Sequence, residues 1–199
     1  MNGVYLELGA RGDGMAWQNL QTMGTRQFRC GYCGYNVAND KGYYSASQKR
    51  GHKYVYICPN CNCATYFDED DRQFPGVAPG NEVEHLPEAL GSLYREARNC
   101  CSVSAYTASV LASRKMLMNI AVQQGAGEGL RFIEYVEYLA SNGFIPPNGR
   151  TWVDHIRRKG NEATHEIALM TQADAEELVA FVEMLLKFVY EFPARVPGP

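Results

Sequence analysis

The hydrophobic pattern divides the chain into two parts with different periods. As far as about residue 67, short apolar runs stand beside tight turns, a pattern typical of β-strands. The runs that predict strands are 26–29, 35–37, 54–57 and 64–67. From residue 88 onward, apolar residues recur every three or four positions, which is the period of an amphipathic α-helix. The sequence therefore predicts a small β unit followed by a helical unit.

The helical part predicts five segments. They span residues 88–101, 106–123, 130–139, a short stretch that includes Trp152 and Ile156, and 174–192. Glycines at 125 and 127 and the Pro146-Pro147 turn separate neighbouring helices. We expect these segments to pack as an all-α antiparallel bundle of about five helices. With the small β zinc ribbon argued below, the fold class is α+β.

Composition marks the boundary between the two parts. An acidic run, Asp68-Glu-Asp-Asp71, precedes a segment that is rich in proline and glycine and has little hydrophobic pattern. Such a segment is typical of a linker. The domain boundaries that follow are an N-terminal arm at 1–24, a zinc ribbon at 25–70, a linker at 71–87, a helical bundle at 88–192 and a C-terminal tail at 193–199.

Two close cysteine pairs carry the strongest chemical signal. They are Cys30-Gly-Tyr-Cys33 and Cys58-Pro-Asn-Cys61. Two intervening residues let both thiolates of a pair face one ion, so the four cysteines predict a tetrahedral Zn²⁺ site. All four positions are then filled by sulfur, which indicates a structural role for the ion. The alternative is four ordinary buried or disulfide-bonded cysteines, and Cys63 is a further thiol that could compete as a ligand.

The expected compartment favours metal over disulfides. The first ten residues have neither a basic start nor an apolar run, so no signal peptide is predicted. The most apolar stretch, 178–190, is short for a bilayer and contains Glu183 and Lys187. We expect a cytoplasmic protein with no membrane association, in which thiols stay reduced.

The net charge of −3 gives no overall signature of nucleic-acid binding, but the charge is unevenly distributed. Residues 25–67 contain six lysines or arginines and one acid, Asp40. A four-thiolate zinc site contributes about −2, so the ribbon stays mildly basic. Its aromatic residues include Phe28, Tyr32, Tyr35, Tyr43, Tyr44, Tyr54, Tyr56 and Tyr66. This mixture of aromatic and basic residues is typical of surfaces that stack on bases. The alternative is that the basic residues are solvated and the rings cover the small core of the ribbon.

One helical segment has an unusual composition. Residues 157–165, Arg-Arg-Lys-Gly-Asn-Glu-Ala-Thr-His, combine three cations, a glycine and a histidine. Arg158 can bind a phosphate in a bidentate fork, and His165 can transfer a proton near neutral pH. These groups suit cleavage of RNA by its own 2′-hydroxyl, which requires no metal. The alternative is that Asn161 and His165 stabilise a helix junction.

The helical part, from about residue 86 to 192, resembles a domain of unknown function in the HEPN superfamily, which often follows a zinc ribbon. The resemblance rests on Leu86-Pro-Glu, on Ser113-Arg114-Lys-Met-Leu117 and on Gly160-Asn-Glu-Ala-Thr-His165. It implies a metal-independent ribonuclease site at a dimer interface, formed by Arg158, Asn161 and His165.

Two positions depart from the pattern of that superfamily. Lys159 follows Arg158 where a polar residue commonly stands, and Met118 replaces an acidic residue. In a non-catalytic member, Arg114 would instead reach Asn161 or His165 and lock the bundle.

Three functions are compatible with these features, and a role linked to nucleic acid is the one we expect. The first is a zinc-ribbon ribonuclease of a prokaryotic toxin or defence system, with RNA as substrate and an antitoxin or effector as partner. The second is a non-catalytic module that binds nucleic acid or a partner protein and dimerises. A purely structural adaptor is a third reading. The resemblance implies a homodimer in either of the first two cases.

Overall fold

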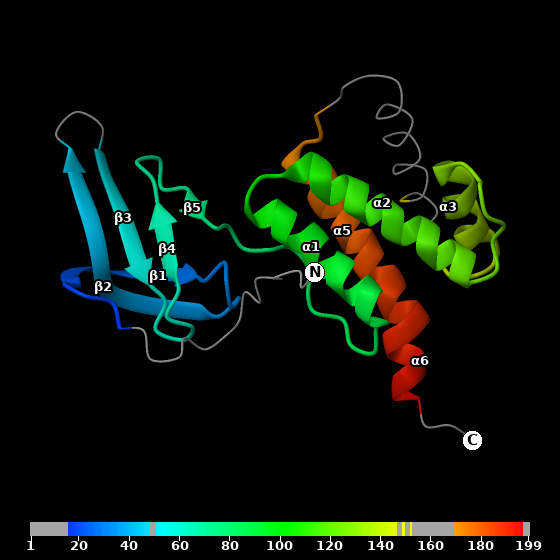
Figure 1. Ribbon diagram of the computed structural model, residues 1–199, viewed down its shortest axis with the longest axis horizontal. Helices are drawn as coiled ribbons and strands as arrows, with labels where there is room; N and C mark the ends of the chain where they lie inside the picture. Colours follow the sequence, from blue (N-terminus) through cyan, green and yellow to red (C-terminus); the bar gives the residue numbers. More distant parts are fainter. Residues whose placement is uncertain (1–15, 48–50, 147–148, 150–151, 153–168, 197–199) are drawn as a thin grey trace, which may run out of the picture. The chain divides into compact units, whose positions relative to one another are not determined.

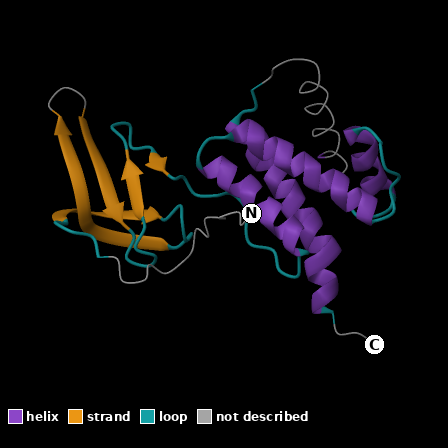
Figure 2. Ribbon diagram, in the orientation of Figure 1, coloured by secondary structure: helices purple, strands orange, loops and turns teal. Residues whose placement is uncertain are grey.

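The computed structural model describes residues 16–47, 51–146, 149, 152 and 169–196. The chain forms two compact units, residues 1–78 and 79–199, and the boundary lies within the segment predicted as a linker. The first unit is a β-sheet and the second is helical (Figures 1 and 2). Each unit has its own hydrophobic cluster. The predicted α+β class is therefore confirmed.

The first unit is one antiparallel sheet whose strands lie in chain order. They are β1 Gln21–Arg29, β2 Asn36–Ser47, β3 Gly51–Ile57, β4 Ala64–Phe67 and β5 Gln73–Phe74. The apolar runs identified in the sequence fall at these strands. β2 also pairs with β3, so the expected hairpins on either side of the cysteine pairs join into a single sheet.

Gly42 allows β2 to pair with both of its neighbours. This residue is the register partner of Gln21 on β1 and of Tyr56 on β3. A Cβ atom at Gly42 would lie 1.9 Å from the carbonyl oxygen of Val55, so no other residue fits without moving the strand. The close approach explains how one long strand connects the two hairpins.

The core of the sheet unit is small and aromatic. Phe28, Tyr56 and Phe67 pack together, with ring centroids 5.5 Å apart for Phe28 and Phe67 and 5.9 Å apart for Tyr56 and Phe67. Cys30 and Cys58 belong to the same buried cluster. These three aromatic rings therefore form the core of the unit. Tyr35 and Tyr44, by contrast, are exposed.

The second unit contains four long helices within the described residues. They are α1 Glu88–Ser102, α2 Tyr106–Gln123, α3 Phe132–Ser141 and α5 Gln172–Leu186. α2 packs against the other three, and α1 and α5 lie beside it (Figure 1). α5 continues through a π-helix, Lys187–Glu191, into the short helix α6, Phe192–Arg195.

The prediction of about five bundled helices is therefore inexact. The last predicted helix, 174–192, is three consecutive pieces of α- and π-helix, because apolar period alone does not distinguish these helix types. The short helix predicted around Trp152 lies outside the described residues except for Trp152 itself. The Trp152 ring packs edge-on against Phe181, with centroids 5.0 Å apart. None of the helices described here has the length and apolar character needed to cross a bilayer.

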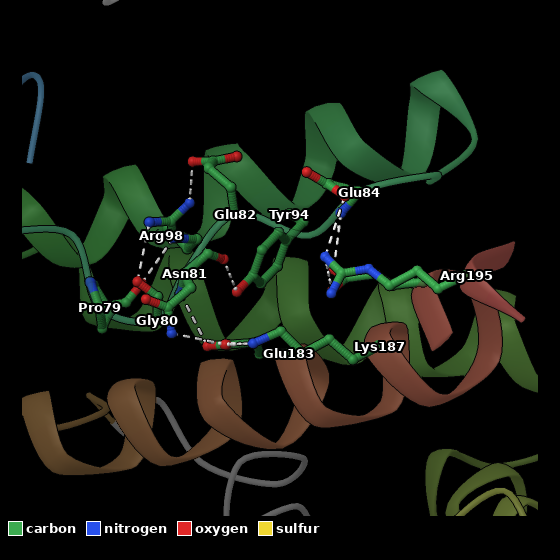
Figure 3. Close-up of polar contacts among 11 residues, drawn as sticks. Pro79, Gly80, Asn81, Glu82, Glu84, Tyr94, Arg98, Glu183, Lys187 and Arg195 are labelled. Carbon is green, nitrogen blue, oxygen red and sulfur yellow. Dashed lines mark hydrogen bonds and ion pairs between the residues drawn. The ribbon is translucent and has the colours of Figure 1, made fainter. Parts of the chain in front are cut away.

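The residues before α1 are bound to the helical unit through a buried carboxylate (Figure 3). Glu183 on α5 is only 9% exposed. Its two carboxylate oxygens accept hydrogen bonds from the backbone and side-chain nitrogens of Asn81, both at 3.0 Å. Lys187 forms an ion pair with the same group. Tyr94 on α1 donates its hydroxyl hydrogen to the Asn81 carbonyl at 2.9 Å.

Arg98 on α1 holds the start of the same segment. Its guanidinium donates to the carbonyl oxygens of Pro79 at 2.8 Å and Gly80 at 3.1 Å, and it pairs with Glu82. The second half of the segment predicted as a linker is thus attached to α1 and α5 by polar contacts. We call residues 79–84 the strap.

The charge of Glu183 should make the stability of the helical unit depend on pH. Burial alone would raise the pKa of Glu183, but hydrogen bonds from Lys187 and Asn81 outweigh it and hold the pKa below its ordinary value. A lowered folded-state pKa contributes stability above the unfolded pKa of about 4.3, and this contribution is lost as pH falls through the folded value.

The test is urea unfolding followed by helical circular dichroism for wild type and Glu183→Gln. At pH 7 the variant should be less stable by about 1–2 kcal/mol. Below about pH 4 the difference should shrink, because wild-type Glu183 then becomes protonated. A difference that stays constant between pH 7 and about pH 3 would contradict a role for the charge.

Candidate metal centre

Four thiols converge at one end of the sheet. Cys30 and Cys33 lie in the turn between β1 and β2, and Cys58 and Cys61 lie in the turn between β3 and β4. All four sulfur atoms lie within 4.8 Å of one another. The Cys30–Cys61 and Cys33–Cys58 sulfur distances are both 3.7 Å. A tetrahedron of sulfurs about 2.3 Å from a central ion has edges of about 3.8 Å, so the cluster fits one metal ion.

The first turn is shaped by two backbone hydrogen bonds. The Cys30 amide donates to the Tyr35 carbonyl, and the Gly34 amide donates to the Cys30 carbonyl, each at 2.9 Å. Gly34 has a φ of +72°, which glycine adopts without strain. We call residues 29–35 the first knuckle.

The second turn, residues 57–63, repeats this pattern and is called the second knuckle. The Cys58 amide donates to the Cys63 carbonyl and the Asn62 amide to the Cys58 carbonyl, again at 2.9 Å. Asn62 takes the left-handed position, with a φ of +61°. Cys63 therefore occupies the place that Tyr35 holds in the first knuckle. Its thiol contacts the Cys61 carbonyl at 3.6 Å and is not part of the four-sulfur cluster.

The chemistry of the thiols agrees with a closed metal site. None of the seven cysteines forms a disulfide. Burial raises the pKa of the Cys30 and Cys61 thiols. Burial also acts to raise the pKa of Cys33, but hydrogen bonds from Asn60 and from the Tyr35 backbone lower it to about 7. An ion bound by all four must displace protons, so its affinity decreases with falling pH.

Gly31 has a role that the sequence did not predict, because it lets the segment after β5 approach the first knuckle. A Cβ atom at Gly31 would lie 2.3 Å from the Pro75 carbonyl oxygen and 2.5 Å from that of Gly76. Gln73 adds a side-chain bond, donating to the Arg29 carbonyl at 2.8 Å. Residues 73–76 belong to the segment predicted as a linker, so the sequence did not predict their contact with the candidate metal site. The sequence signal was the glycine within the Cys-Gly-Tyr-Cys motif.

Acidic residues after β4 form ion pairs with two of the basic residues counted for the ribbon. Asp71 pairs with Arg26 at 2.6 Å, and Glu69 pairs with Lys53 at 3.0 Å. The Arg26 guanidinium also lies 3.7 Å from the centroid of the Phe67 ring. Two of the cations counted over residues 25–67, Arg26 and Lys53, are therefore paired with acids that follow β4.

The predicted catalytic residues Arg158, Asn161 and His165 lie outside the described residues, so their convergence stays a prediction. Arg114, which the sequence analysis connected with them, lies on α2 and is half-buried. Its guanidinium lies 4.3 Å from the centroid of the Phe132 ring on α3. Burial lowers the pKa of Arg114.

Fold and site together define a class: an α+β protein with a four-cysteine cluster that could hold a metal ion on its sheet unit, and a separate helical unit. Residues 95–197, slightly more than half of the chain, match the family described as a domain of unknown function, DUF4145. The chain belongs to this family. The comparison with curated proteins and the comparison with solved structures found no significant match.

Proposed function

We propose that this protein is a zinc-ribbon protein that binds nucleic acid through its sheet unit. The observation that carries the proposal is the four-sulfur cluster, which joins two knuckles at the end of a five-stranded sheet. Because a four-thiolate site leaves no open coordination position, the ion would hold the sheet together without taking part in chemistry. The sheet unit then serves as a recognition module.

Zinc is the metal we propose for this site. Four thiolates in tetrahedral arrangement suit Zn²⁺, which is a borderline-soft ion without a preferred geometry of its own. Reduced thiols that bind metal also favour a cytoplasmic location.

Nucleic acid is the partner that the side chains of the sheet unit support. One tyrosine of the first knuckle, Tyr35, is well exposed there, at 64%. Exposed aromatic rings stack on bases of any sequence, and nearby cations bind phosphates. Arg29 is an exposed cation on the same sheet unit. Aromatic and basic groups on one stable sheet favour single-stranded RNA or DNA.

A second candidate function is a metal-independent ribonuclease in the helical unit. It rests on the sequence spacing of Arg158, Asn161 and His165 and on the resemblance to the HEPN superfamily. In this function Arg158 would bind the scissile phosphate and His165 would transfer the proton. The protein would then work as a homodimer, with an antitoxin or effector partner in a prokaryotic toxin or defence system.

Binding is tested with purified, zinc-loaded protein and a fluorescent single-stranded oligonucleotide. We expect the anisotropy to report binding that weakens as salt increases, because phosphate contacts release counterions. Protein whose zinc has been removed should bind much more weakly, because the sheet loses its metal support. Equal binding with and without zinc would contradict a role for the ribbon.

Cleavage is tested with labelled RNA in excess EDTA, comparing wild type with His165→Ala. The ribonuclease function predicts metal-independent cleavage that leaves 2′,3′-cyclic phosphate ends and is lost in the variant. His155→Ala, a histidine outside the motif, is the matched control. Absence of cleavage across varied RNAs would leave the non-catalytic binding function as the better one.

A further inference from the structure

Arg29 differs from the other lysine and arginine side chains that the structure describes in the sheet unit. In the described part of that unit, four cations each pair with an acid within 3.6 Å: Arg26, Lys41, Lys53 and Arg72. Arg29 forms no ion pair with a described acid. Its Nε donates to the Gly34 carbonyl at 2.9 Å, which places the guanidinium beside the first knuckle. Its charge is therefore available to an anion.

Tyr35 is the chain neighbour of Gly34, the residue whose carbonyl accepts the hydrogen bond from Arg29. It follows Gly34 directly, and its ring is 64% exposed. The Cys30 amide donates to the Tyr35 carbonyl at 2.9 Å, so the backbone of Tyr35 is joined to the residue after Arg29. The knuckle thus fixes the relative position of a cation and an exposed aromatic ring.

Comparison of the two knuckles shows that neither residue is needed for the turn. At the position of Arg29, the second knuckle has Ile57, which is only 4% exposed. At the position of Tyr35 it has Cys63. The same backbone hydrogen bonds and the same pair of metal-facing thiols form with these different residues. The architecture of the metal site therefore does not explain why Arg29 and Tyr35 stand at the first knuckle.

We propose that Arg29 and Tyr35 form a nucleotide-binding contact for single-stranded nucleic acid, a site that rests on the proposed function. Arg29 binds a phosphate oxygen through its guanidinium. Tyr35 stacks on the adjacent base. The strand must be single, because the face of a base is accessible to a protein ring only when the base is unstacked from its neighbours. The metal holds both side chains in place by fixing the knuckle.

The experiment uses full-length, zinc-loaded protein and a fluorescein-labelled uridine dodecamer, with anisotropy measured at several salt concentrations. Tyr35→Ala should weaken binding about tenfold, and Tyr35→Phe should bind like wild type, because the ring carries the stacking. Arg29→Gln should weaken binding and lower the slope of log affinity against log salt by about one phosphate contact. Both side chains are exposed, so zinc content and circular dichroism should not change.

Two matched controls isolate the site. Tyr44→Ala removes another exposed tyrosine, which lies within β2 away from the knuckle. Lys41→Ala removes a cation that already pairs with Asp40. Both variants should bind within about twofold of wild type.

Three outcomes would overturn the site. If the wild type binds the dodecamer but Tyr44→Ala weakens binding as much as Tyr35→Ala, the contact lies elsewhere on the sheet, while the proposed function stands. If the wild type does not bind the dodecamer, the site and the proposed function both fail. If a glutamate-rich peptide of the same length binds as tightly as the dodecamer, the knuckle recognises acidic protein instead.

Discussion

Cys58→Ser should abolish stoichiometric metal binding and unfold the sheet unit, while the helical unit stays folded. Cys58 is 1% exposed and belongs to the same buried cluster as Phe28 and Phe67, so the site is part of the small core. Structural zinc in small domains contributes apparent folding free energies of about 10–16 kcal/mol. A core as small as this one does not replace such a contribution.

The measurement is the amount of zinc per protein chain after dialysis. Near-ultraviolet circular dichroism follows the tyrosines, and far-ultraviolet circular dichroism follows the helices. Zinc content should fall close to zero, and the tyrosine signal should decrease in the variant to the part that comes from the helical unit. The helical signal should persist, because the helices have a separate hydrophobic cluster.

Cys63→Ser is the matched control for this prediction. Cys63 lies two residues from Cys61, but its sulfur is not part of the four-sulfur cluster. The control should keep one zinc per chain and wild-type spectra. Stoichiometric zinc in Cys58→Ser, or loss of zinc in Cys63→Ser, would contradict the assignment of the four ligands.

Gly80→Ala should destabilise the helical unit by about 2–4 kcal/mol, because it adds backbone strain and displaces buried polar groups. Gly80 has a φ of +72°, a conformation that L-residues other than glycine adopt at a cost. An added Cβ would lie 2.7 Å from a carboxylate oxygen of Glu183 and 2.9 Å from the Tyr94 hydroxyl. Both groups hold Asn81 in the strap, so moving them breaks the hydrogen bonds described above.

Urea unfolding followed by helical circular dichroism gives the size of this effect. Gly127→Ala is the control, since no atom lies within 4 Å of the added Cβ and its φ is not positive. This control should change stability by no more than about 0.5 kcal/mol. Similar unfolding curves for the two variants would show that the strap contributes little to the stability of the unit.

The elements of the fold could largely be predicted from local patterns. The segments 88–101 and 106–123 correspond to α1 and α2 almost residue for residue, because an amphipathic stripe bounded by turn residues defines a helix locally. β5 could not be predicted, since a two-residue strand has no recognisable period. Its position depends on contacts with the first knuckle, in which Gly31 allows the close approach.

The buried charge in the helical unit shows a different limit. Glu183 was visible in the sequence as an acid within the most apolar stretch, which indicates a carboxylate in need of partners. Its partner Asn81 is 102 residues away, in a segment that composition alone assigns to a linker. The need for a partner could be inferred, whereas the identity of the partner could not.

The sequence alone determined the two-part α+β organisation and the four cysteines of the candidate metal site, because periodicity and Cys-x-x-Cys spacing act over a few residues. Tertiary structure decided which thiols converge, since it places Cys63 outside the cluster. It also decided the surface charge of the sheet unit, because Arg26 and Asp71, 45 residues apart, become an ion pair only after folding. Electrostatic pairing depends on distance in space, and this is why the exposed Arg29, which forms no ion pair with a described acid, could be identified only in the folded chain.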